Sequence, residues 1–566
     1  GIPRRTNCNK ILVVLRHRRR TTLVMRSATA EQSGGYDLKT VLFALNSSYS
    51  HTNLAVRAIG AALADAGFET VVLEKNLKDP RLGVLYALYA ERAGVYGFSV
   101  YIWNVREMLR IASELKSLLP EAAIVFGGPE VSFSDDGFFA EHPFVDFIIA
   151  GEGEEAFPAL CRALERGESV PRLYRAAPFA AFASSGIYYD RIGDAPHGLV
   201  YYESVRGCPF SCSYCLSSIE EGIRAKSAEK ALRDLLAFEV FDGIRTVKLV
   251  DRTFNFDRER AKMIWRGLAD ERYTKEYHFE VSAALLDEES FALLARVPKG
   301  KFRLEIGVQS TNPDTIRAVS RALDTEKTLA ALKRLHAAGN LHIHADLIAG
   351  LPYEAFASFG RSFDAVYGHA DVLQLGFLKL LRGSHLRESA ADYGIRYSPE
   401  PPYQVLKTAA LSFDDIMRLE GIESLVERFS NSGRFSYTFP YLPLAFGSAF
   451  GFFDRLCRFM EEAFGQEEIS RLSQTEAFRL VMTFAEEASQ NGISLDVRQI
   501  KERLALDFLL GESRRLPPFL SEVLAAAEEK ARCLSGIPAY QRASSEVVKL
   551  TFLTDTPVVV NRAEHR

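Results

Sequence analysis

The sequence predicts an α/β protein in three consecutive parts: a doubly wound parallel sheet, a partial (β/α)6 barrel and a mostly helical C-terminal domain. Two observations lead to this prediction. Between Thr40 and Leu378, short apolar segments alternate with helix-length segments, and the apolar segments resemble parallel strands that are buried on both faces. Beyond about Pro399 the strand signals fade, and apolar residues recur at helical spacing.

Composition and periodicity divide the chain into five segments. At 566 residues it is too long for one hydrophobic core. Its 47% hydrophobic and 25% charged residues are typical of a soluble globular protein, and the lack of an apolar run of about 18 residues argues against a membrane span. We expect a basic disordered extension over 1–35, an α/β domain over 36–165, a linker over 166–197, a partial barrel over 198–395 and a helical domain over 396–566.

The first 30 residues hold eight Lys or Arg and no acid, so the remaining chain carries −12 against a net charge of −4 for the whole. An acidic body gives no electrostatic reason to bind nucleic acid. The basic segment has three interpretations: a transit peptide, a disordered arm, or translated upstream sequence with Met25 as the true start. We expect one of the last two and leave the segment out of the fold prediction.

Five strands are expected in the first domain, separated by helices such as Asn53–Ala66 and Val105–Leu119. Helices on both faces would give a Rossmann-like sheet, and ligands of such sheets bind beyond the carboxyl ends of the strands. Residues 166–197 are irregular and rich in Ala, Pro and Gly, as a linker would be. The expected strands are Thr40–Leu45, Glu69–Leu73, Gly94–Ser99, Ala123–Phe126 and Phe144–Ile149.

A second β/α series begins near Leu199, and six consecutive units predict a partial TIM-type barrel whose chemistry lies in the loops after the strands. Its expected strands are Leu199–Ser204, Thr246–Val250, His278–Ser282, Arg303–Val308, His342–Ile348 and Val372–Leu378. Its expected helices are Ser227–Phe238, Arg258–Leu268, Glu289–Ala295, Thr325–Ala338 and Ala355–Val366. Further helices are expected at Asp414–Phe429, Gly451–Phe464, Thr475–Ala488 and Ile500–Leu510.

Three thiols, Cys208, Cys212 and Cys215, follow the first strand of the second series. The other four cysteines are scattered, which is not a disulfide framework and indicates a reducing, cytoplasmic location. Thiolates select iron–sulfur clusters, zinc or copper(I), and three thiolates on a [4Fe-4S] cube leave one iron open for a ligand. The alternatives are a zinc site with a distant fourth ligand such as His197, or chance clustering.

The Cys-x3-Cys-x2-Cys loop, with the aromatic Tyr214 before its last cysteine, resembles the radical S-adenosylmethionine (SAM) superfamily over about residues 198 to 385. The resemblance implies that SAM chelates the fourth iron and that Tyr214 packs near its adenine. It also implies that one electron, from a donor such as flavodoxin or ferredoxin, cleaves SAM to a 5′-deoxyadenosyl radical that abstracts hydrogen from the substrate.

Later strands carry further segments that resemble the SAM-binding parts of this family. Gln309 and Ser310 belong to a Gly-x-Gln-Ser segment and would lie over the ribose and carboxylate, and Gly350 opens a Gly-Leu-Pro turn that would approach the adenine. Each could alternatively be ordinary turn chemistry, but their order behind the cysteine loop favours SAM. The full set of expected SAM residues is Tyr214, Asp251, Ser282, Glu305, Gln309, Ser310 and Gly350.

Small and polar loops follow the strands of the first domain, and they resemble the cobalamin-binding domain of the B12-dependent radical SAM branch over roughly residues 38 to 165. The Asp-x-His-x-x-Gly motif that ligates cobalt elsewhere is absent, so we expect no protein His on cobalt. A nicotinamide site is excluded because no Gly-x-Gly-x-x-Gly follows the first strand. The expected corrinoid residues are Ser47, Tyr49, His51, Ser99, Tyr101, Trp103, Gly127, Gly128, Glu130, Gly151, Glu152, Gly153 and Glu154.

Three of these positions have an ordinary structural alternative. His51 could be a hydrogen-bonded loop histidine, Trp103 a packing residue, and the Gly127-Gly128 pair a tight turn without a ligand. In the C-terminal domain the aromatic residues at 435, 437, 439 and 441 alternate with small or polar ones. They could cap the barrel over a substrate or belong to the core.

The resemblance implies a methyl transfer from SAM, through the corrinoid, to an unactivated carbon of a small-molecule or peptide substrate. Three alternatives stay open: a cobalamin-dependent radical rearrangement or ring closure, a methylthiotransferase-like enzyme without corrinoid, and a non-catalytic cobalamin or redox sensor. No nucleic acid and no membrane are expected as partners.

Overall fold

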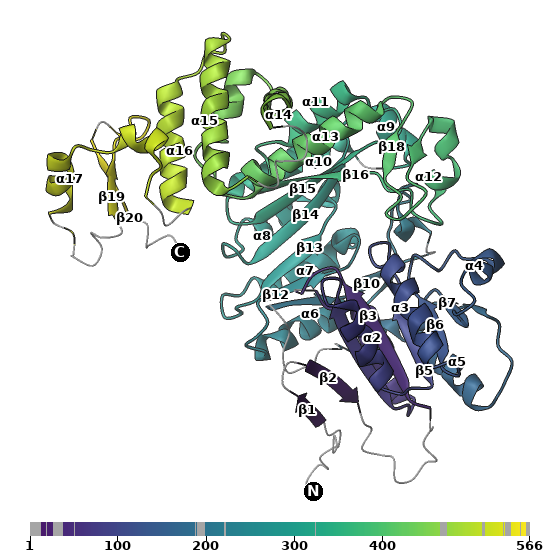
Figure 1. The fold of residues 1–566 in the computed structure, drawn as a ribbon. Helices are drawn as coiled ribbons and strands as arrows, with labels where there is room; N and C mark the ends of the chain where they lie inside the picture. The colour runs from purple at the N-terminus through teal and green to yellow at the C-terminus, as the bar shows by residue number, and fades with distance from the viewer. Residues whose placement is uncertain are drawn as a thin grey trace, which may run out of the picture.

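The fold was examined in a computed structural model, which describes residues 13–17, 20–25, 38–49, 51–186, 188, 198–219, 222–322, 324–464, 472–511, 515–535, 537, 545–554 and 556–561. Two parallel sheets with flanking helices are followed by a helical C-terminal part, which confirms the predicted fold class (Figure 1). None of the helices in this described part combines the length and apolar character that crossing a bilayer requires.

The first sheet has the strand order β1-β2-β4-β3-β5-β6-β7-β8. Strand β3 (Thr40–Asn46) is buried along its whole length, and it pairs in parallel with β4 on one side and β5 on the other. The strand order therefore reverses next to β3, and the loops after β3 and β5 flank the crevice in which such sheets bind ligands. The other parallel strands are β4 (Thr70–Asn76), β5 (Val95–Ser99), β6 (Ala123–Gly127), β7 (Phe147–Ala150) and β8 (Leu173–Arg175).

Helices cover both faces of this sheet through two separate apolar clusters. On one face α1 (Leu54–Asp65) and α5 (Gly153–Glu165) pack against the sheet. The opposite face carries α2 (Arg81–Ala90), α3 (Val105–Leu118) and α4 (Asp136–Glu141). Both faces are thus covered, which explains why the strands are continuously apolar in the sequence.

Two parts of the sheet were not expected. The predicted linker over 166–197 contributes β8, which pairs with the edge strand β7. The predicted disordered extension contains β1 (Val13–His17) and β2 (Arg20–Met25), and β2 runs antiparallel to β4 from Leu23 to Met25. Both additions extend the sheet by backbone hydrogen bonds to an outer strand. Strands held in this way need no regular pattern of apolar side chains, so a short one is not visible in the sequence. The remainder of residues 1–35 lies outside the described residues.

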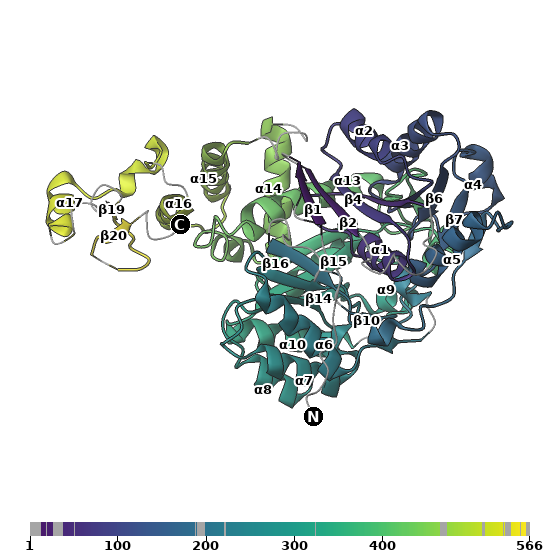
Figure 2. The ribbon, with the colours of Figure 1, turned by 90° about the horizontal axis from the view of Figure 1, so that it is seen from below.

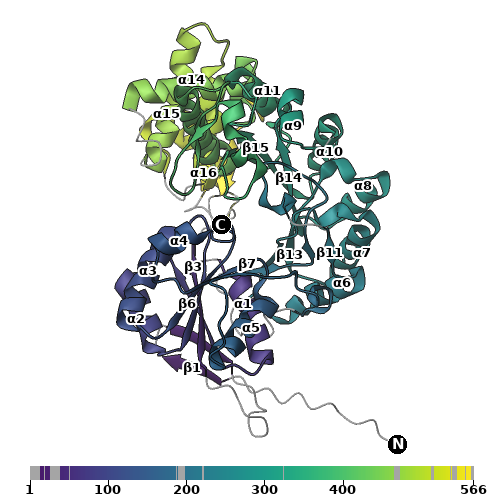
Figure 3. The same cartoon turned by 90° about the vertical axis from the view of Figure 1, so that its right-hand side faces the viewer.

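The second sheet has the strand order β16-β15-β14-β13-β12-β9, so six parallel strands follow one another in chain order. Along β14 buried and half-buried residues alternate, and its buried residues join the core beneath the outer helices. Figures 2 and 3 show these helices around the outer side of the curved sheet. The strands are β9 (Leu199–Tyr202), β12 (Thr246–Leu249), β13 (Glu276–Glu280), β14 (Phe302–Gln309), β15 (His342–Ala349) and β16 (Val372–Phe377).

Five of the six helices described in this second unit match predicted segments closely, and the short helix at Pro313–Ala318 was not predicted. The six helices are α6 (Ala228–Ala237), α7 (Arg258–Leu268), α8 (Glu288–Leu294), α9 (Pro313–Ala318), α10 (Thr325–Ala338) and α11 (Phe356–Val366).

A helical region follows, and in Figure 1 its last part lies at the end of the molecule farthest from the first sheet. Its four predicted helices are present. A two-stranded hairpin, β19 (Ser545–Val548) and β20 (Val558–Asn561), was not predicted. The region contains α12 (His385–Glu388), β17 (Arg396–Tyr397), β18 (Val405–Lys407), α13 (Phe413–Leu425) with a π-helical continuation at Val426–Asn431, α14 (Ala449–Phe464), α15 (Gln474–Gln490), α16 (Val497–Gly511) and α17 (Ala527–Leu534).

Three of the four aromatic residues from 435 to 441 belong to the packing of this region, whereas Tyr437 is 37% exposed. Phe435 and Phe439 are each 2% exposed and stack within an aromatic core around Phe429. The ring of Tyr441 lies 4.2 Å from the guanidinium of Arg503. Of the two interpretations of this segment, the structure supports the core over a cap above a substrate.

Candidate active site

The cysteine loop leaves the second sheet just after β9 and is closed at its base by two short strands. These strands, β10 (Val205–Arg206) and β11 (Arg224–Ala225), pair antiparallel. Between them, Gly207 adopts a φ of +89°, and a Cβ atom there would collide with the carbonyl oxygen of Gly222. The glycine before the first cysteine is therefore required for the loop to close.

All three thiols of the loop are free. Cys212 is buried, whereas Cys208 and Cys215 are half-buried, and the Cys215 amide donates to the Cys212 carbonyl at 3.0 Å. The Cys208 Sγ lies 3.4 Å from the Thr253 Oγ1, in the segment after β12. Three free thiols on one closed loop form a donor set that fits an iron–sulfur cube, in which each thiolate binds a different iron.

A zinc site needs its ligands gathered around one ion, whereas a cube spreads three thiolates over three irons. Within the described ranges, no three His, Cys, Asp or Glu side chains are close enough together to hold one metal ion. His197, the suggested fourth ligand, lies outside the described residues.

Arg321 joins the loop to the second sheet. Its Nη1 lies 3.7 Å from the Cys212 Sγ and donates to the Tyr214 hydroxyl at 3.0 Å, and its Nη2 donates to the Gly307 carbonyl. Burial raises the pKa of the Cys212 thiol, and the charge of Arg321 opposes part of that rise. Sequence reasoning missed Arg321 because a single arginine between two helices carries no pattern.

Two of the expected SAM residues are fully buried, and their side chains hold the surrounding backbone. Asp251 accepts hydrogen bonds from the amides of Ser204 and Val205, at 2.7 and 3.0 Å, just before the cysteine loop. The Ser310 hydroxyl accepts from the Asn312 amide at 3.0 Å and donates to Glu354. Their side chains are thus occupied within the protein, and contacts from their backbones to SAM stay predictions.

Other expected SAM residues lie on the inner side of the second sheet. Glu305 accepts from the Lys248 Nζ at 3.1 Å and lies 3.0 Å from the His278 Nε2. Although burial opposes it, the interactions with His278 and Lys248 lower the pKa of Glu305 to about 2. Gln309 sits at a bulge with φ of +69°, and its buried Oε1, like the Ser282 Oγ, has no hydrogen-bond partner among the described residues. Both groups are therefore available to a ligand.

Gly350, expected to approach the adenine, has a close protein neighbour. Its φ is +90°, and a Cβ atom there would lie 2.6 Å from the Val405 Cγ1 in β18. The packing of β18 across the end of β15 thus already requires a glycine. Contact with the adenine stays a prediction.

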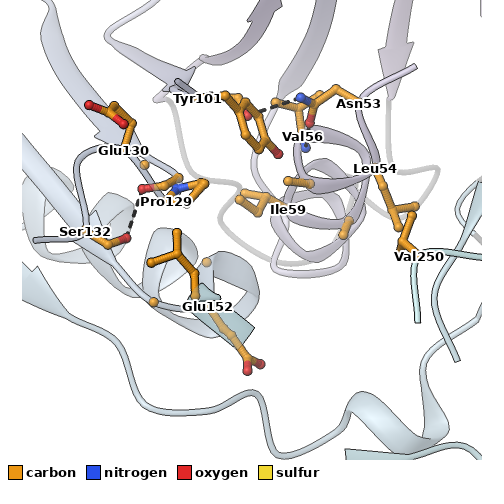
Figure 4. A pocket seen from close by; sticks show the side chains of 18 of the residues that line it. Asn53, Leu54, Val56, Ile59, Tyr101, Pro129, Glu130, Ser132, Glu152 and Val250 are labelled. Carbon is orange, nitrogen blue, oxygen red and sulfur yellow. Dashed lines mark hydrogen bonds between the residues drawn. The ribbon is translucent and has the colours of Figure 1, made fainter. Parts of the chain in front are cut away.

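A cavity of about 900 Å³ lies between the carboxyl-end loops of the first sheet and the entry to the second. In Figure 4 Val250 approaches it from the second sheet and faces Leu54 of α1. Tyr214 and Cys215 of the cysteine loop also line it. Among the expected corrinoid residues, those lining the cavity are Ser47, His51, Ser99, Tyr101, Trp103, Gly127, Gly128, Glu130, Gly151, Glu152, Gly153 and Glu154.

Tyr49 is the one expected corrinoid residue that does not line this cavity. Its ring is 51% exposed, and its hydroxyl donates to Asp79 at 3.1 Å on the outer surface. Tyr49 was predicted from its place in the polar loop after the first strand, and loop residues have no fixed period that would tell which side chains face the cavity.

Planar and polar groups line the cavity. Trp103 is 49% exposed and stacks on Tyr101, with ring centroids 4.4 Å apart and planes at 8°. This aromatic surface suits a large flat ligand. The His51 Nδ1 lies 3.2 Å from the hydroxyl of Tyr201 on β9, and burial lowers the pKa of His51. His51 is thus a hydrogen-bonded loop histidine that contacts the second domain.

Glu130 connects the first sheet to the region after the barrel. It is 7% exposed, accepts a hydrogen bond from the Tyr403 hydroxyl, and lies 3.4 Å from the Arg382 Nε. Burial raises the pKa of Glu130, and these two partners oppose the rise. Arg382 also lines the cavity, and sequence reasoning missed both partners because they lie more than 250 residues away in the chain.

Three domain families match successive parts of the chain. The B12 binding domain matches residues 41–161 and the radical SAM superfamily matches residues 202–366. Residues 391–549 match a family described as a protein of unknown function, DUF4080.

Curated relatives cover the first two of these parts. The chain is 25% identical over 411 residues to 2-(S-pantetheinyl)-carbapenam-3-carboxylate methyltransferase of Streptantibioticus cattleyicolor, covering 62% of this chain and 58% of that protein. It is 26% identical over 354 residues to the cobalamin-dependent radical SAM methyltransferase TokK of Streptomyces tokunonensis, covering 55% and 50%. The chain thus matches little more than half the length of these relatives.

Solved structures share the fold. The cobalamin-dependent SAM radical enzyme OxsB with aqua-cobalamin bound has a TM-score of 0.59 at 14% identity, over 89% of this chain and 82% of that one. The radical SAM methyltransferase TsrM from Kitasatospora setae has a TM-score of 0.52 at 20% identity, over 64% and 80%. With the cysteine loop, the cavity between the two sheets and the two matched domains, the chain is a radical SAM protein that contains a B12-binding domain.

Proposed function

We propose that this protein is a cobalamin-dependent radical SAM enzyme that transfers a methyl group to an unactivated carbon. One observation carries the proposal: a single cavity is lined both by the loops of the B12-binding domain and by Tyr214 and Cys215 of the cysteine loop. A corrinoid and a SAM molecule held in this way would lie on two sides of one substrate. The names of the two relatives, both methyltransferases, support the same reaction type.

When bound, the cluster supplies the electron that cleaves SAM to a carbon radical, and the corrinoid supplies the methyl group. The protein's own residues hold and orient these groups. The three thiols would bind three irons, and the Tyr101–Trp103 stack would support the flat face of the corrinoid. Arg321, between Cys212 and Tyr214, would place a fixed positive charge beside the thiolates that hold the cluster.

Enclosure is the second contribution of the chain. Leu54 and Ile59 of the B12-binding domain and Val250 of the barrel give the cavity apolar walls on two sides (Figure 4). A water-poor site protects a carbon radical from side reactions. The substrate class, small molecule or peptide, belongs to this proposal, as do a flavodoxin- or ferredoxin-like electron donor and a cytoplasmic location.

A second candidate function is a radical ring closure without methyl transfer. A relative supports it: the anaerobic magnesium-protoporphyrin IX monomethyl ester cyclase of Synechocystis is 20% identical over 314 residues. The same two-domain cavity would serve this reaction, so the products decide between the two.

The test is an anaerobic incubation of the reconstituted protein with SAM, a reductant and hydroxocobalamin, followed by mass spectrometry of the nucleosides. S-adenosylhomocysteine together with 5′-deoxyadenosine supports methyl transfer. 5′-Deoxyadenosine alone supports the ring closure instead. If neither forms while the protein retains its cluster and cobalamin, the enzyme proposal is wrong and a sensor remains. The Cys212→Ala variant, treated identically, controls for reduction of SAM by the chemical reductant.

A further inference from the structure

The base of the cysteine loop carries two arginines that face each other. Arg206 on β10 and Arg224 on β11 are direct register partners in the two-residue strand pair that closes residues 207–223. Like charges on directly opposed strand residues are destabilising. Two residues of backbone pairing cannot offset this repulsion well, so the closed loop needs negative charge at this point.

The negative charge comes from the B12-binding domain. The Glu152 carboxylate accepts from the Arg206 Nη1 at 2.6 Å and from the Arg224 Nη1 at 3.0 Å, so one side chain bridges both arginines. Glu154 accepts from the Arg206 Nη2 at 2.5 Å. Glu203, next to β10, adds a third carboxylate 2.9 Å from Arg206.

These charges are shielded from water. The side chains of Arg206, Glu152 and Glu154 are 12, 16 and 6% exposed. The Phe179 amide donates to Glu152 at 2.7 Å, and the Phe182 ring lies 4.6 Å from the Arg206 guanidinium. Removing one partner of such a buried pair leaves the other charge uncompensated, which is far more costly than at a surface.

The direction of Glu152 separates it from a corrinoid ligand. In Figure 4 its carboxylate points away from Asn53 and Tyr101, the polar and aromatic groups on the opposite side of the cavity. Arg206, its partner, stands two residues before Cys208. The Gly-Glu-Gly-Glu segment therefore contacts the base of the cysteine loop through the ion pairs of Glu152 and Glu154 with Arg206.

We propose that Glu152 and Glu154 are positioning residues of the cysteine loop: the B12-binding domain closes the loop by neutralising Arg206 and Arg224. The cluster would then be held correctly only when both domains are in contact. This inference rests on the proposed function in so far as the loop holds a cluster. The closure of the loop by Glu152 and Glu154 involves only side chains of the chain and does not depend on a bound cluster.

The test compares Glu152→Gln, Glu154→Gln and the double variant with the wild type. In the metal-free full-length protein, amide hydrogen exchange over residues 207–223 should accelerate about tenfold or more in Glu152→Gln, because a buried charge pair is broken. In the reconstituted protein the midpoint potential of the cluster should shift to more positive values, since uncompensated guanidinium charge favours the reduced form. The affinity for hydroxocobalamin should fall far less in these variants than in Trp103→Ala, which removes a stacked ring from the cavity.

Two further variants sharpen the test. Glu91→Gln is the matched control, because Glu91 pairs with Lys39 at 2.9 Å in the same domain and is 20% exposed, away from the loop. Its exchange and potential should equal those of the wild type. Glu152→Gln combined with Arg224→Gln removes the repulsion together with its neutralising partner, so loop protection should largely return. Recovery of loop protection in the combined variant would also show that Glu152→Gln opens the loop and does not misfold the whole protein.

Unchanged loop exchange and unchanged potential, with weaker hydroxocobalamin binding in Glu152→Gln, would overturn the inference and make Glu152 a corrinoid residue. Failure of the combined variant to restore protection would also overturn it. A wild-type protein that takes up no iron would contradict the proposed function, while the exchange measurement on metal-free protein would still decide the closure.

Discussion

Cys212 is the most deeply buried of the three loop thiols, at 6% exposure, and it contacts Arg321. Cys212→Ala should abolish cluster assembly: anaerobic reconstitution should give about four irons per wild-type chain and almost none in the variant. Iron content and the visible thiolate-to-iron absorption measure this. Cys161→Ala is the control, because Cys161 is a buried thiol on α5 that contacts Thr40 and should behave as a small apolar residue. Full iron content in Cys212→Ala would contradict the assignment.

Gly350 offers a second test at the level of one residue. Gly350→Ala should destabilise the fold by about 1–3 kcal/mol, because its φ is positive and the new methyl would meet Val405. Urea unfolding of the metal-free protein measures this loss. Adding Val405→Ala should recover only the steric part of the loss. A neutral Gly350→Ala variant would show that β18 does not pack tightly against this turn.

Asp507 should make stability depend on pH. It is 3% exposed and accepts from the Tyr437 and Thr438 amides, and burial raises its pKa to about 6 despite those hydrogen bonds. A carboxyl with a raised folded-state pKa stabilises the fold below its unfolded pKa, and that contribution is lost as the pH rises through the folded pKa. The loss between about pH 4 and pH 6 is at most about 3 kcal/mol.

The variant Asp507→Asn cannot titrate, so its Tm relative to that of the wild type should rise as the pH increases through this range. Thermal unfolding at several pH values checks the trend. A difference in Tm that stays constant with pH would show that Asp507 keeps an ordinary pKa.

At the residue scale, the sequence was informative where chemistry imposes a fixed spacing. The three cysteines could be singled out because a cube needs several thiolates on one short loop, and the structure places Tyr214 beside them in the cavity; their roles toward a cluster and SAM stay predictions. The loops after β3, β5, β6 and β7 were predictable because parallel strands bring their carboxyl ends to one edge. Arg321 and Tyr403 were not, because their contacts with Cys212 and Glu130 arise only when distant segments meet.

At the scale of elements, the edge strand β16 is covered by the helical region. The Asn431 side chain, at the end of the π-helical turn after α13, accepts from the Leu373 amide at 3.0 Å and donates to the Leu373 carbonyl at 2.9 Å. It thus mimics one residue of a neighbouring strand on an edge that would otherwise be open. The helical region is fixed to the barrel at this point.

Asn431→Ala should cost about 1–3 kcal/mol, because it leaves both backbone groups of Leu373 without this partner. Hydrogen exchange of the Leu373 amide should accelerate, which mass spectrometry of the β16 peptide would detect. Asn431→Asp keeps an acceptor for the amide, but it puts a carboxylate oxygen against the Leu373 carbonyl and the Glu427 carboxylate, so it should also destabilise the fold. Equal exchange in all three proteins would contradict the proposed edge contact.

Long periodic elements were predictable to within a few residues, and short paired ones were not. Helices α7 and α10 match their predicted bounds, since Asp257 and Asp324 cap their first turns and Gly339 ends α10 at a φ of +68°. Strand β8 and the hairpin β19–β20 have three or four residues per strand. Such strands are held by backbone bonds to a partner that the sequence does not reveal.

At the scale of the whole molecule, one cavity joins two domains, so a ligand that fills it should stabilise both. Hydroxocobalamin at 100 times its Kd should add about 2.7 kcal/mol to the folded state by mass action. Limited proteolysis should then slow in the B12-binding domain and in the cysteine loop together. Protection confined to residues 36–165 would show that the corrinoid does not bridge the domains. Trp103→Ala, which removes the stacked ring, should weaken both effects.

The second sheet is open, with β9 and β16 as its two margins and no ladder joining them in the part of the chain that the structure describes. The diameter of a closed barrel is set by the number of its strands and their stagger, and widening the barrel breaks hydrogen bonds between strands. In this sheet the gap between β9 and β16 can widen without breaking hydrogen bonds between strands. The distance between the two outer strands depends on the contacts that each makes with neighbouring parts of the chain. These are the His51 contact with Tyr201 on β9 and the Asn431 contact with Leu373 on β16. Moving either support would therefore change the spacing of β9 and β16 while the strand-to-strand hydrogen bonds stay intact.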